Sequence, residues 1–214
     1  SRVAINGRCF IENAGLWYGF HDIQGYDPLI LKRYVEYINR SQGFPPDNKV
    51  VNLHYVTRFD NNLIRLLNLK YVVDCEGKRL VKINPYIPRC YIVHDMTTKD
   101  ENEILDFMME EGFDPLKQVV FEKGNAPERH LLPEPVPGSH EKCRITSYEN
   151  DEIKLVAEMV TPGFLVLSEI NYPGWQVFVD GEKREIFTGN YLFRVVELNS
   201  GRHDIHFVFT PLSF

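Results

Sequence analysis

Two histidine-containing pairs are the places in this sequence where acid–base or metal chemistry would begin. His21 is followed directly by Asp22, and a carboxylate can orient an imidazole that acts as a general base. The sequence assigns no Ser, Cys or Thr nucleophile to this pair, so we interpret it as a polar loop. His203 and His206 are three residues apart on a predicted strand, where such side chains point to opposite faces. We therefore predict no metal site there.

The motifs of nucleophilic and phosphoryl-transfer enzymes do not occur in the chain. Ser168 is followed by Glu169, without the surrounding glycines of a G-x-S-x-G elbow. Residues 15–19 read GLWYG, which is aromatic, and no strand–GxGxxG–helix unit is present. Nothing in the sequence selects one pair of carboxylates for glycosidase chemistry. We therefore predict that this chain is not an enzyme and has no catalytic residue and no cofactor.

Aromatic side chains are the remaining candidates for ligand binding, because their faces can stack on sugar rings. The candidates are Trp17, Tyr18, Tyr172, Trp175 and Tyr191. A core of this size also uses large aromatics, since each buries much apolar area. For Trp175 the core interpretation is favoured, because Val177 and Val179 share its strand face. For Tyr18, in a glycine-flanked loop, both interpretations stay open.

Helices and strands alternate over the first 122 residues. Residues 26–29 (YDPL) are typical of a helix start, because Asp27 can accept from free N–H groups and Pro28 fits the first helical position. This helix is expected to end at 43–46 (GFPP). The other predicted elements are a strand at 50–56, a helix at 60–67 capped by Asp60, a hairpin of 69–75 and 79–84, a strand at 89–94, a helix that begins with a capping box at 98–101 and ends at Gly112, and a strand at 118–122.

The second half predicts strands alone, after a proline-rich segment at 123–142 that we interpret as a linker. Seven short candidates follow, at 143–148, 153–160, 164–169, 175–179, 182–187, 191–198 and 203–209. Asp180-Gly181 is typical of a two-residue type I′ hairpin. In the last strand Ile205, Phe207 and Phe209 face one way, while Asp204 and His206 face the other.

These patterns predict an α+β protein in three parts. Residues 1–122 form a mixed α/β region, 123–142 the linker, and 143–214 an all-β sandwich of jelly-roll or immunoglobulin-like type. The chain of 214 residues is long enough for one large or two small domains, and 43% of it is hydrophobic.

Charge and hydropathy limit the partners of this chain. Its net charge of −6 argues against nucleic acid and against a generally anionic membrane surface, which both require clustered Lys and Arg. No apolar run approaches the roughly 18–20 residues of a membrane span. The sequence opens at Ser1 without an initiator Met or a signal peptide, so we expect a fragment of a longer protein.

Four separate cysteines, Cys9, Cys75, Cys90 and Cys143, form no C-x-x-C pair. They allow three disulfide pairings or four buried thiols. We expect free thiols, because a core of this size does not need covalent cross-links.

A series of short motifs resembles the C-terminal extracytoplasmic region of the YfhO family, which are polytopic bacterial membrane proteins related to GT-C glycosyltransferases. The specific part of the series lies at 167–175 (LSEINYPGW), 179–181 (VDG), 190–194 (NYLFR), 200–203 (SGRH) and 207–214 (FVFTPLSF). Weaker upstream pieces lie at 25–28 (GYDP), 33–34, 67–73 (LNLKYVV), 84 with 88–89, 91–93 and 113–115 (FDP), so the resemblance covers most of the chain. Asn171 departs from the aromatic expected before Tyr172, which weakens a ligand-binding interpretation there.

The resemblance implies a domain on the extracytoplasmic face of the bacterial cytoplasmic membrane, joined to the membrane by segments absent from this sequence. The catalytic acidic residues of such proteins lie in loops outside this sequence, so none is assigned here. We expect a non-catalytic domain that assists handling of a cell-envelope glycan or lipid-linked sugar. The alternatives are a free-standing carbohydrate-binding or adhesion module and a small hydrolase that uses His21 and Asp22.

Overall fold

Strands dominate the computed structural model of this protein, which describes residues 2–7, 9–10, 14–24, 30–47, 56–128 and 140–211. They form one sheet of three strands, one of five and one of six. The β-rich character predicted for the second half is confirmed, since β7 to β14 all lie in it. In the described residues no helix combines the length and apolar character that crossing a membrane requires.

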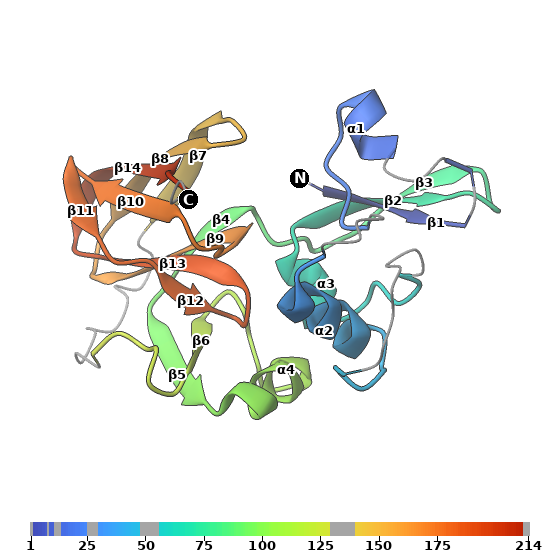
Figure 1. Ribbon diagram of the computed structural model, residues 1–214, viewed down its shortest axis with the longest axis horizontal. Helices are drawn as coiled ribbons and strands as arrows, with labels where there is room; N and C mark the ends of the chain where they lie inside the picture. Colours follow the sequence, from blue (N-terminus) through green and yellow to red (C-terminus); the bar gives the residue numbers. More distant parts are fainter. Residues whose placement is uncertain are drawn as a thin grey trace. The chain divides into compact units, whose positions relative to one another are not determined.

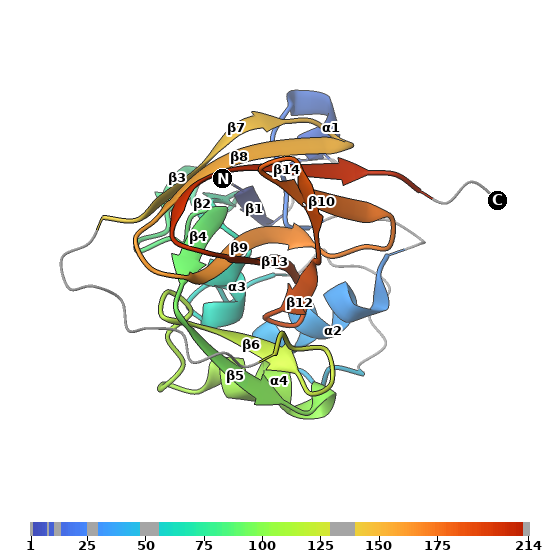
Figure 2. The same cartoon turned by 90° about the vertical axis from the view of Figure 1, so that its left-hand side faces the viewer.

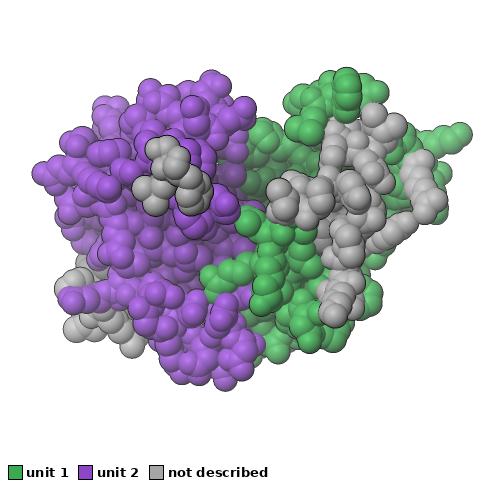
Figure 3. All heavy atoms as spheres, in the orientation of Figure 1, with its two compact units in different colours: residues 1–89, 105–111 green, residues 90–104, 112–214 purple. Residues whose placement is uncertain are grey.

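The chain divides into two compact units, which Figure 3 colours separately. Unit 1 comprises residues 1–89 and 105–111, and unit 2 comprises 90–104 and 112–214. The sequence-based division at 123–142 stays a prediction, and residues 129–139 of that linker lie outside the described residues. The two compact units differ from the parts expected from the sequence because strands within residues 1–122 pair with strands within residues 143–214. Such long-range pairing leaves no local pattern in a sequence.

Unit 1 is a three-layered unit built on the sheet β1-β2-β3. Strand β1 (Arg2–Asn6) runs parallel to β2 (Leu69–Asp74), which pairs antiparallel with β3 (Arg79–Lys82). Helix α1 (Ala14–Tyr18) lies on one side of this sheet, and α2 (Lys32–Ser41) and α3 (Asn62–Leu66) lie on the other (Figures 1 and 2).

The helical and hairpin predictions for unit 1 are partly confirmed. The hairpin of β2 and β3 forms as expected, and α2 ends just before Gly43. The cap of α3 is Asn61, whose side chain accepts from the Ile64 N–H, so the prediction of Asp60 as the cap is wrong by one residue. Strand β1 and helix α1 have no counterpart among the predicted elements. The helix start at 26–29 and residues 50–55 of a predicted strand lie outside the described residues.

A disulfide between Cys9 and Cys75 joins the segment after β1 to the end of β2 in unit 1. The Cα atoms of the two residues are 5.3 Å apart, within the usual range for a disulfide. The expectation of free thiols is therefore wrong for this pair, because β1 and β2 are parallel neighbours and bring two cysteines distant in sequence together. It is confirmed for Cys90 and Cys143, which are free.

Unit 2 contains two sheets that lie one above the other in Figure 2. The five-stranded sheet has the order β11-β10-β14-β8-β7, and the six-stranded sheet has the order β4-β9-β13-β12-β6-β5. The first consists of β7 (Lys142–Tyr148), β8 (Glu152–Met159), β10 (Trp175–Val179), β11 (Glu182–Arg184) and β14 (Gly201–Phe209). The second consists of β4 (Cys90–Val93), β5 (Asp95–Lys99), β6 (Gln118–Glu122), β9 (Gly163–Ile170), β12 (Phe187–Gly189) and β13 (Phe193–Leu198).

Alternating side chains of both sheets in unit 2 share one hydrophobic core. Val177 of β10 and Phe207 of β14 are fully buried, as is Leu165 of β9 in the other sheet. Ile205 is buried too, so the predicted inward face of the last strand is confirmed. The hairpin after β10 also forms as predicted, because Asp180 and Gly181 both have the positive φ that a type I′ turn requires.

Two local predictions in unit 2 are wrong. The single strand expected at 182–187 is two strands, β11 and β12, which belong to different sheets. The capping box at 98–101 does not form, because Thr98 lies in β5 and pairs in parallel with Phe121 of β6. Helix α4 (Glu101–Met109) begins only after this strand ends, and its residues are divided between the two units.

Candidate functional site

Trp17 and Tyr18, two of the five candidate ligand-binding residues, are exposed next to each other on α1 of unit 1. The exposed fraction is 77% for Trp17, 67% for Tyr18 and 86% for the neighbouring Leu16. Phe10 packs edge-on against Tyr18, with ring centroids 5.9 Å apart. We call Phe10, Leu16, Trp17 and Tyr18 the α1 aromatic surface. It combines broad apolar faces with the polar edges of Trp and Tyr.

Backbone hydrogen bonds fix α1 to the sheet of unit 1. The Gly15 carbonyl accepts from the Phe20 N–H at 3.1 Å, and a Cβ on Gly15 would lie 2.5 Å from the Phe20 oxygen, so only glycine fits there. The His21 carbonyl accepts from the Val3 N–H, and the Val3 carbonyl accepts from the Ile23 N–H. Helix α1 is therefore joined to β1 through the segment that directly follows it.

Trp175, a third candidate, packs into unit 2. Its ring centroid lies 5.4 Å from that of Phe209 and 3.6 Å from the Arg194 guanidinium, and its side chain contacts the shared core. Tyr172 is 47% exposed, with its ring centroid 6.5 Å from that of Phe209. These contacts agree with the core interpretation of Trp175 and leave Tyr172 at the edge of the same aromatic group.

The Arg194 side chain is buried beneath Trp175. Its Nε donates to the Ile170 carbonyl at 3.1 Å, and its Nη1 has no hydrogen-bond partner among the described residues. Burial lowers the pKa of Arg194 to about 10, against the opposing effect of the Glu169 and Tyr148 charges. The guanidinium is therefore still charged at neutral pH, and it occupies the Trp175 ring face that it covers.

Tyr191, the fifth candidate, lies inside unit 2 with an exposed fraction of 6%. It follows Asn190 in the turn between β12 and β13, where both residues have positive φ. The Asn190 Oδ1 accepts from the Val120 N–H at 2.9 Å, and its Nδ2 donates to the Tyr91 hydroxyl at 3.2 Å. The structure thus places Tyr191 in a buried turn, where its ring is not exposed to a ligand in solvent.

The two histidines of β14 engage different carboxylates. His203 Nδ1 lies 2.6 Å from Asp180 Oδ2, and His206 Nε2 lies 2.6 Å from Glu152 Oε1. The pKa of Asp180 is below its usual value. The main cause is the hydrogen bond that the Asp204 N–H donates to its carboxylate, and the second is the hydrogen bond with His203. Over the described part of the chain, no three His, Cys, Asp or Glu side chains group as metal ligands.

The Asp22 carboxylate contacts the backbone of its own loop. Its Oδ1 accepts from the Gln24 N–H at 2.9 Å. Burial raises the pKa of Asp22, and the hydrogen bonds from the Gln24 and Ile23 N–H groups partly oppose that shift. The interpretation of His21 and Asp22 as a polar loop therefore agrees with the carboxylate contacts.

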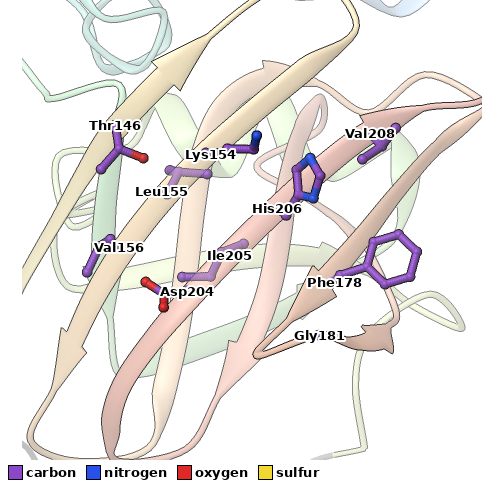
Figure 4. A pocket seen from close by; sticks show the side chains of 10 residues that line it. All are labelled: Thr146, Lys154, Leu155, Val156, Phe178, Gly181, Asp204, Ile205, His206 and Val208. Carbon is purple, nitrogen blue, oxygen red and sulfur yellow. The ribbon is translucent and has the colours of Figure 1, made fainter.

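The outward face of the five-stranded sheet carries a shallow pocket of about 580 Å³, shown in Figure 4. His206 of β14, Phe178 of β10 and Lys154 of β8 line it with polar and aromatic side chains. The nearby Glu152 binds both Lys154, at 3.1 Å, and His206. The hydrogen bonds from these two side chains lower the pKa of Glu152, and the one from Lys154 has the larger effect. Glu152 thus contacts both basic side chains of the pocket, Lys154 and His206.

Phe178 and Lys154 are pocket residues that the sequence did not single out. Each alternates with inward residues: Phe178 stands between Val177 and Val179, and Lys154 stands between Ile153 and Leu155. The signal available in the sequence is this alternation, which places an aromatic side chain on the solvent face of a strand.

No protein-family model, curated protein or solved structure matches this chain. A functional assignment therefore depends on the surfaces described above and on the motifs of the sequence.

Proposed function

We propose that this chain is a non-catalytic extracytoplasmic domain of a polytopic bacterial membrane protein of the YfhO type, related to GT-C glycosyltransferases. In this proposal it assists the handling of cell-envelope glycans or lipid-linked sugars, and segments beyond the present sequence attach it to the membrane. The observation that carries the proposal is the α1 aromatic surface, where Trp17 and Tyr18 are exposed by 77% and 67% on neighbouring positions of α1. Such rings offer stacking faces to a pyranose.

The Cys9–Cys75 disulfide supports the proposed location. Disulfides persist in oxidising environments outside the cytoplasm and are rare in reducing ones. A chain that carries one is therefore better suited to the extracytoplasmic face of the membrane than to the cytosol.

The fold type of unit 2 belongs to the same proposal. Its two sheets share a core, and we propose that they form a sandwich of jelly-roll or immunoglobulin-like type. Jelly-roll and immunoglobulin-like sandwiches consist of antiparallel strands. The parallel pair of β5 and β6 is therefore an addition to either type of sandwich.

Fractionation of the producing cells tests the location. We expect an antibody against this chain to detect it in the membrane fraction after an alkaline wash, in a protein larger than 25.0 kDa. We also expect added protease to cleave the epitope in intact spheroplasts. A chain found in the soluble cytoplasmic fraction, or protected from protease until the cells are lysed, would contradict the proposal.

Binding of cell-wall polymers tests the role of the α1 aromatic surface. We expect calorimetric titration with fragments of the cell-envelope polymer from the producing organism to show binding that Trp17→Ala weakens at least tenfold. Phe44→Ala is the matched control, because Phe44 is a 51% exposed aromatic of the same unit away from α1. Equal losses in both variants would remove α1 from the site.

A free-standing carbohydrate-binding or adhesion module is the second candidate, and the same exposed Trp17 favours it. The two candidates differ in attachment to the membrane. Glycan binding by a chain that an alkaline wash releases from the membranes would favour the free-standing module.

A further inference from the structure

Unit 1 contains a pocket of about 790 Å³ in which positive charge collects. Its charged lining residues are Arg58, Arg65, Lys82 and Asp60. Three cations and one carboxylate give a formal charge of 3 − 1 = +2 at neutral pH, whereas the whole chain carries −6. The pocket is therefore a local exception to the charge of the protein.

The cations of this pocket have no ion-pair partner among the described residues. Elsewhere in unit 1, Arg79 pairs with Asp74 at 2.9 Å and Lys32 with Glu36 at 3.4 Å. The Arg65 Nη1 donates to the neutral Asn62 Oδ1 at 3.1 Å, and the Arg65 Nε has no hydrogen-bond partner in the described part of the chain. An uncompensated group of cations favours an external anion.

One wall of the pocket is fixed by the buried side chain of Gln42. Its Oε1 accepts from the Thr57 and Arg58 N–H groups, at 2.8 and 2.9 Å, and its Nε2 donates to the Arg58 carbonyl at 3.1 Å. Gln42 is only 9% exposed, so these bonds form away from water. The backbone that carries Arg58 is thus held in place without a ligand.

The other walls are fixed as well. Arg65 lies on α3, whose first turn the Asn61 side chain caps at 3.1 Å. Lys82 is the last residue of β3, and the next residue, Ile83, donates to the Lys70 carbonyl at 2.9 Å. Three separate elements therefore hold the cations around one concavity, which reduces the ordering cost of binding.

We propose that this pocket binds an anionic ligand through a phosphate group. A phosphate monoester carries about −1.5 to −2 charges at neutral pH, which matches the formal +2 of the lining. Guanidinium groups match phosphate oxygens with paired N–H donors, and the pocket supplies two of them with one ammonium. The inference concerns unit 1 residues outside the α1 aromatic surface and does not depend on the function proposed above.

Calorimetric titration of the full chain with inorganic phosphate and pyrophosphate tests the site. We expect saturable binding that Arg65→Gln and Lys82→Gln each weaken roughly tenfold, which corresponds to about 1.4 kcal/mol, because each variant removes a charged hydrogen-bond donor. Arg58→Gln is a third variant, with an exposed side chain, should Arg65→Gln fail to fold. Lys78→Gln is the matched control, because it removes the same charge from the turn at the opposite end of β3.

Two outcomes would overturn the proposal: absence of phosphate and pyrophosphate binding, or equal affinity in the wild type, the control and all pocket variants. Separate arms distinguish the source of the phosphate. A soluble sugar phosphate forms one arm, and phosphatidylcholine vesicles with or without phosphatidylglycerol form the other. Pocket-dependent binding of only the sugar phosphate identifies a soluble ligand, and pocket-dependent binding of only the phosphatidylglycerol vesicles identifies a lipid headgroup.

Discussion

Units 1 and 2 are stabilised in different ways. Unit 2 buries one core between two sheets, with Phe207 and Val177 fully inside it. Unit 1 is built on a three-stranded sheet, with short helices on both sides and a disulfide across 66 residues of sequence. The exposed aromatic surface and the cationic pocket both lie in unit 1. Unit 1 also has buried side chains, such as Tyr37, Leu63 and Leu69, but its sheet is smaller and carries the covalent cross-link.

The largest effect we expect comes from the core of unit 2. Phe207→Ala removes a fully buried ring from β14, between β10 and β8, and should lower the free energy of unfolding by about 3–5 kcal/mol. Urea denaturation measures the loss, and hydrogen exchange should locate it in the strands of unit 2. Phe44→Ala, at a 51% exposed ring, should change stability by less than about 0.5 kcal/mol. Similar values for the two variants would contradict the core assigned here.

The second effect concerns the disulfide of unit 1. Replacing Cys9 and Cys75 by serine should lower the free energy of unfolding by about 2–4 kcal/mol, because the open chain gains conformational entropy. Hydrogen exchange should report the loss in unit 1. Cys143→Ser is the control, since Cys143 is free.

Thiol titration checks the same disulfide directly. The unreduced, denatured protein should show two reactive thiols, because two of its four cysteines are joined. Four thiols would mean that the cross-link is absent.

A smaller effect is expected at the buried Asn190, which links the β12–β13 turn to β6. Glycine tolerates the positive φ of this position, so Asn190→Gly preserves the backbone conformation. The variant removes the hydrogen bonds to the Val120 N–H and the Tyr91 hydroxyl. We expect a loss of about 2–3 kcal/mol in thermal or urea unfolding, because buried polar groups are left unsatisfied. Asn199→Gly, in an exposed turn, is the control, and an equal loss there would assign the effect to the backbone alone.

The smallest effect depends on pH. Burial by itself would raise the pKa of Glu141, but hydrogen bonds from the Thr161 N–H, His94 and the Val160 N–H outweigh it and lower the pKa below its usual value. A carboxylate whose folded pKa is depressed stabilises the protein above its unfolded pKa, and the stabilisation disappears as the pH falls through the folded pKa.

Glu141→Gln should therefore cost roughly 1–2 kcal/mol at neutral pH and almost nothing in acid, in urea unfolding measured across the acidic range. Glu158→Gln changes the same charge at an exposed position of β8 and should show little pH-dependent difference. If the stability difference between wild type and Glu141→Gln is the same at every pH, the Glu141 carboxylate is not the source of the expected pH dependence.

Local patterns predicted those parts of the fold that neighbouring residues specify. Alternation placed Val177, Val179, Ile205 and Phe207 in a core, and Asp180-Gly181 identified the hairpin after β10. Strand β5 was missed because its Thr98 also suits a helix cap, and only parallel pairing with β6 decides between the two. Residues 182–187 were assigned to one strand because nothing local marks the change from one sheet to the other at β11 and β12.

The sequence by itself determined the β-rich second half, its turns and the inward face of its strands, since these follow from side chains a few positions apart. Only the tertiary structure decided which candidates are exposed, because exposure depends on packing between distant segments. It exposed Trp17 and Tyr18, packed Trp175 on Arg194 and buried Tyr191 in a turn. It also joined Cys9 to Cys75 and gathered Arg58, Arg65 and Lys82 around one pocket, which no spacing in the chain predicts.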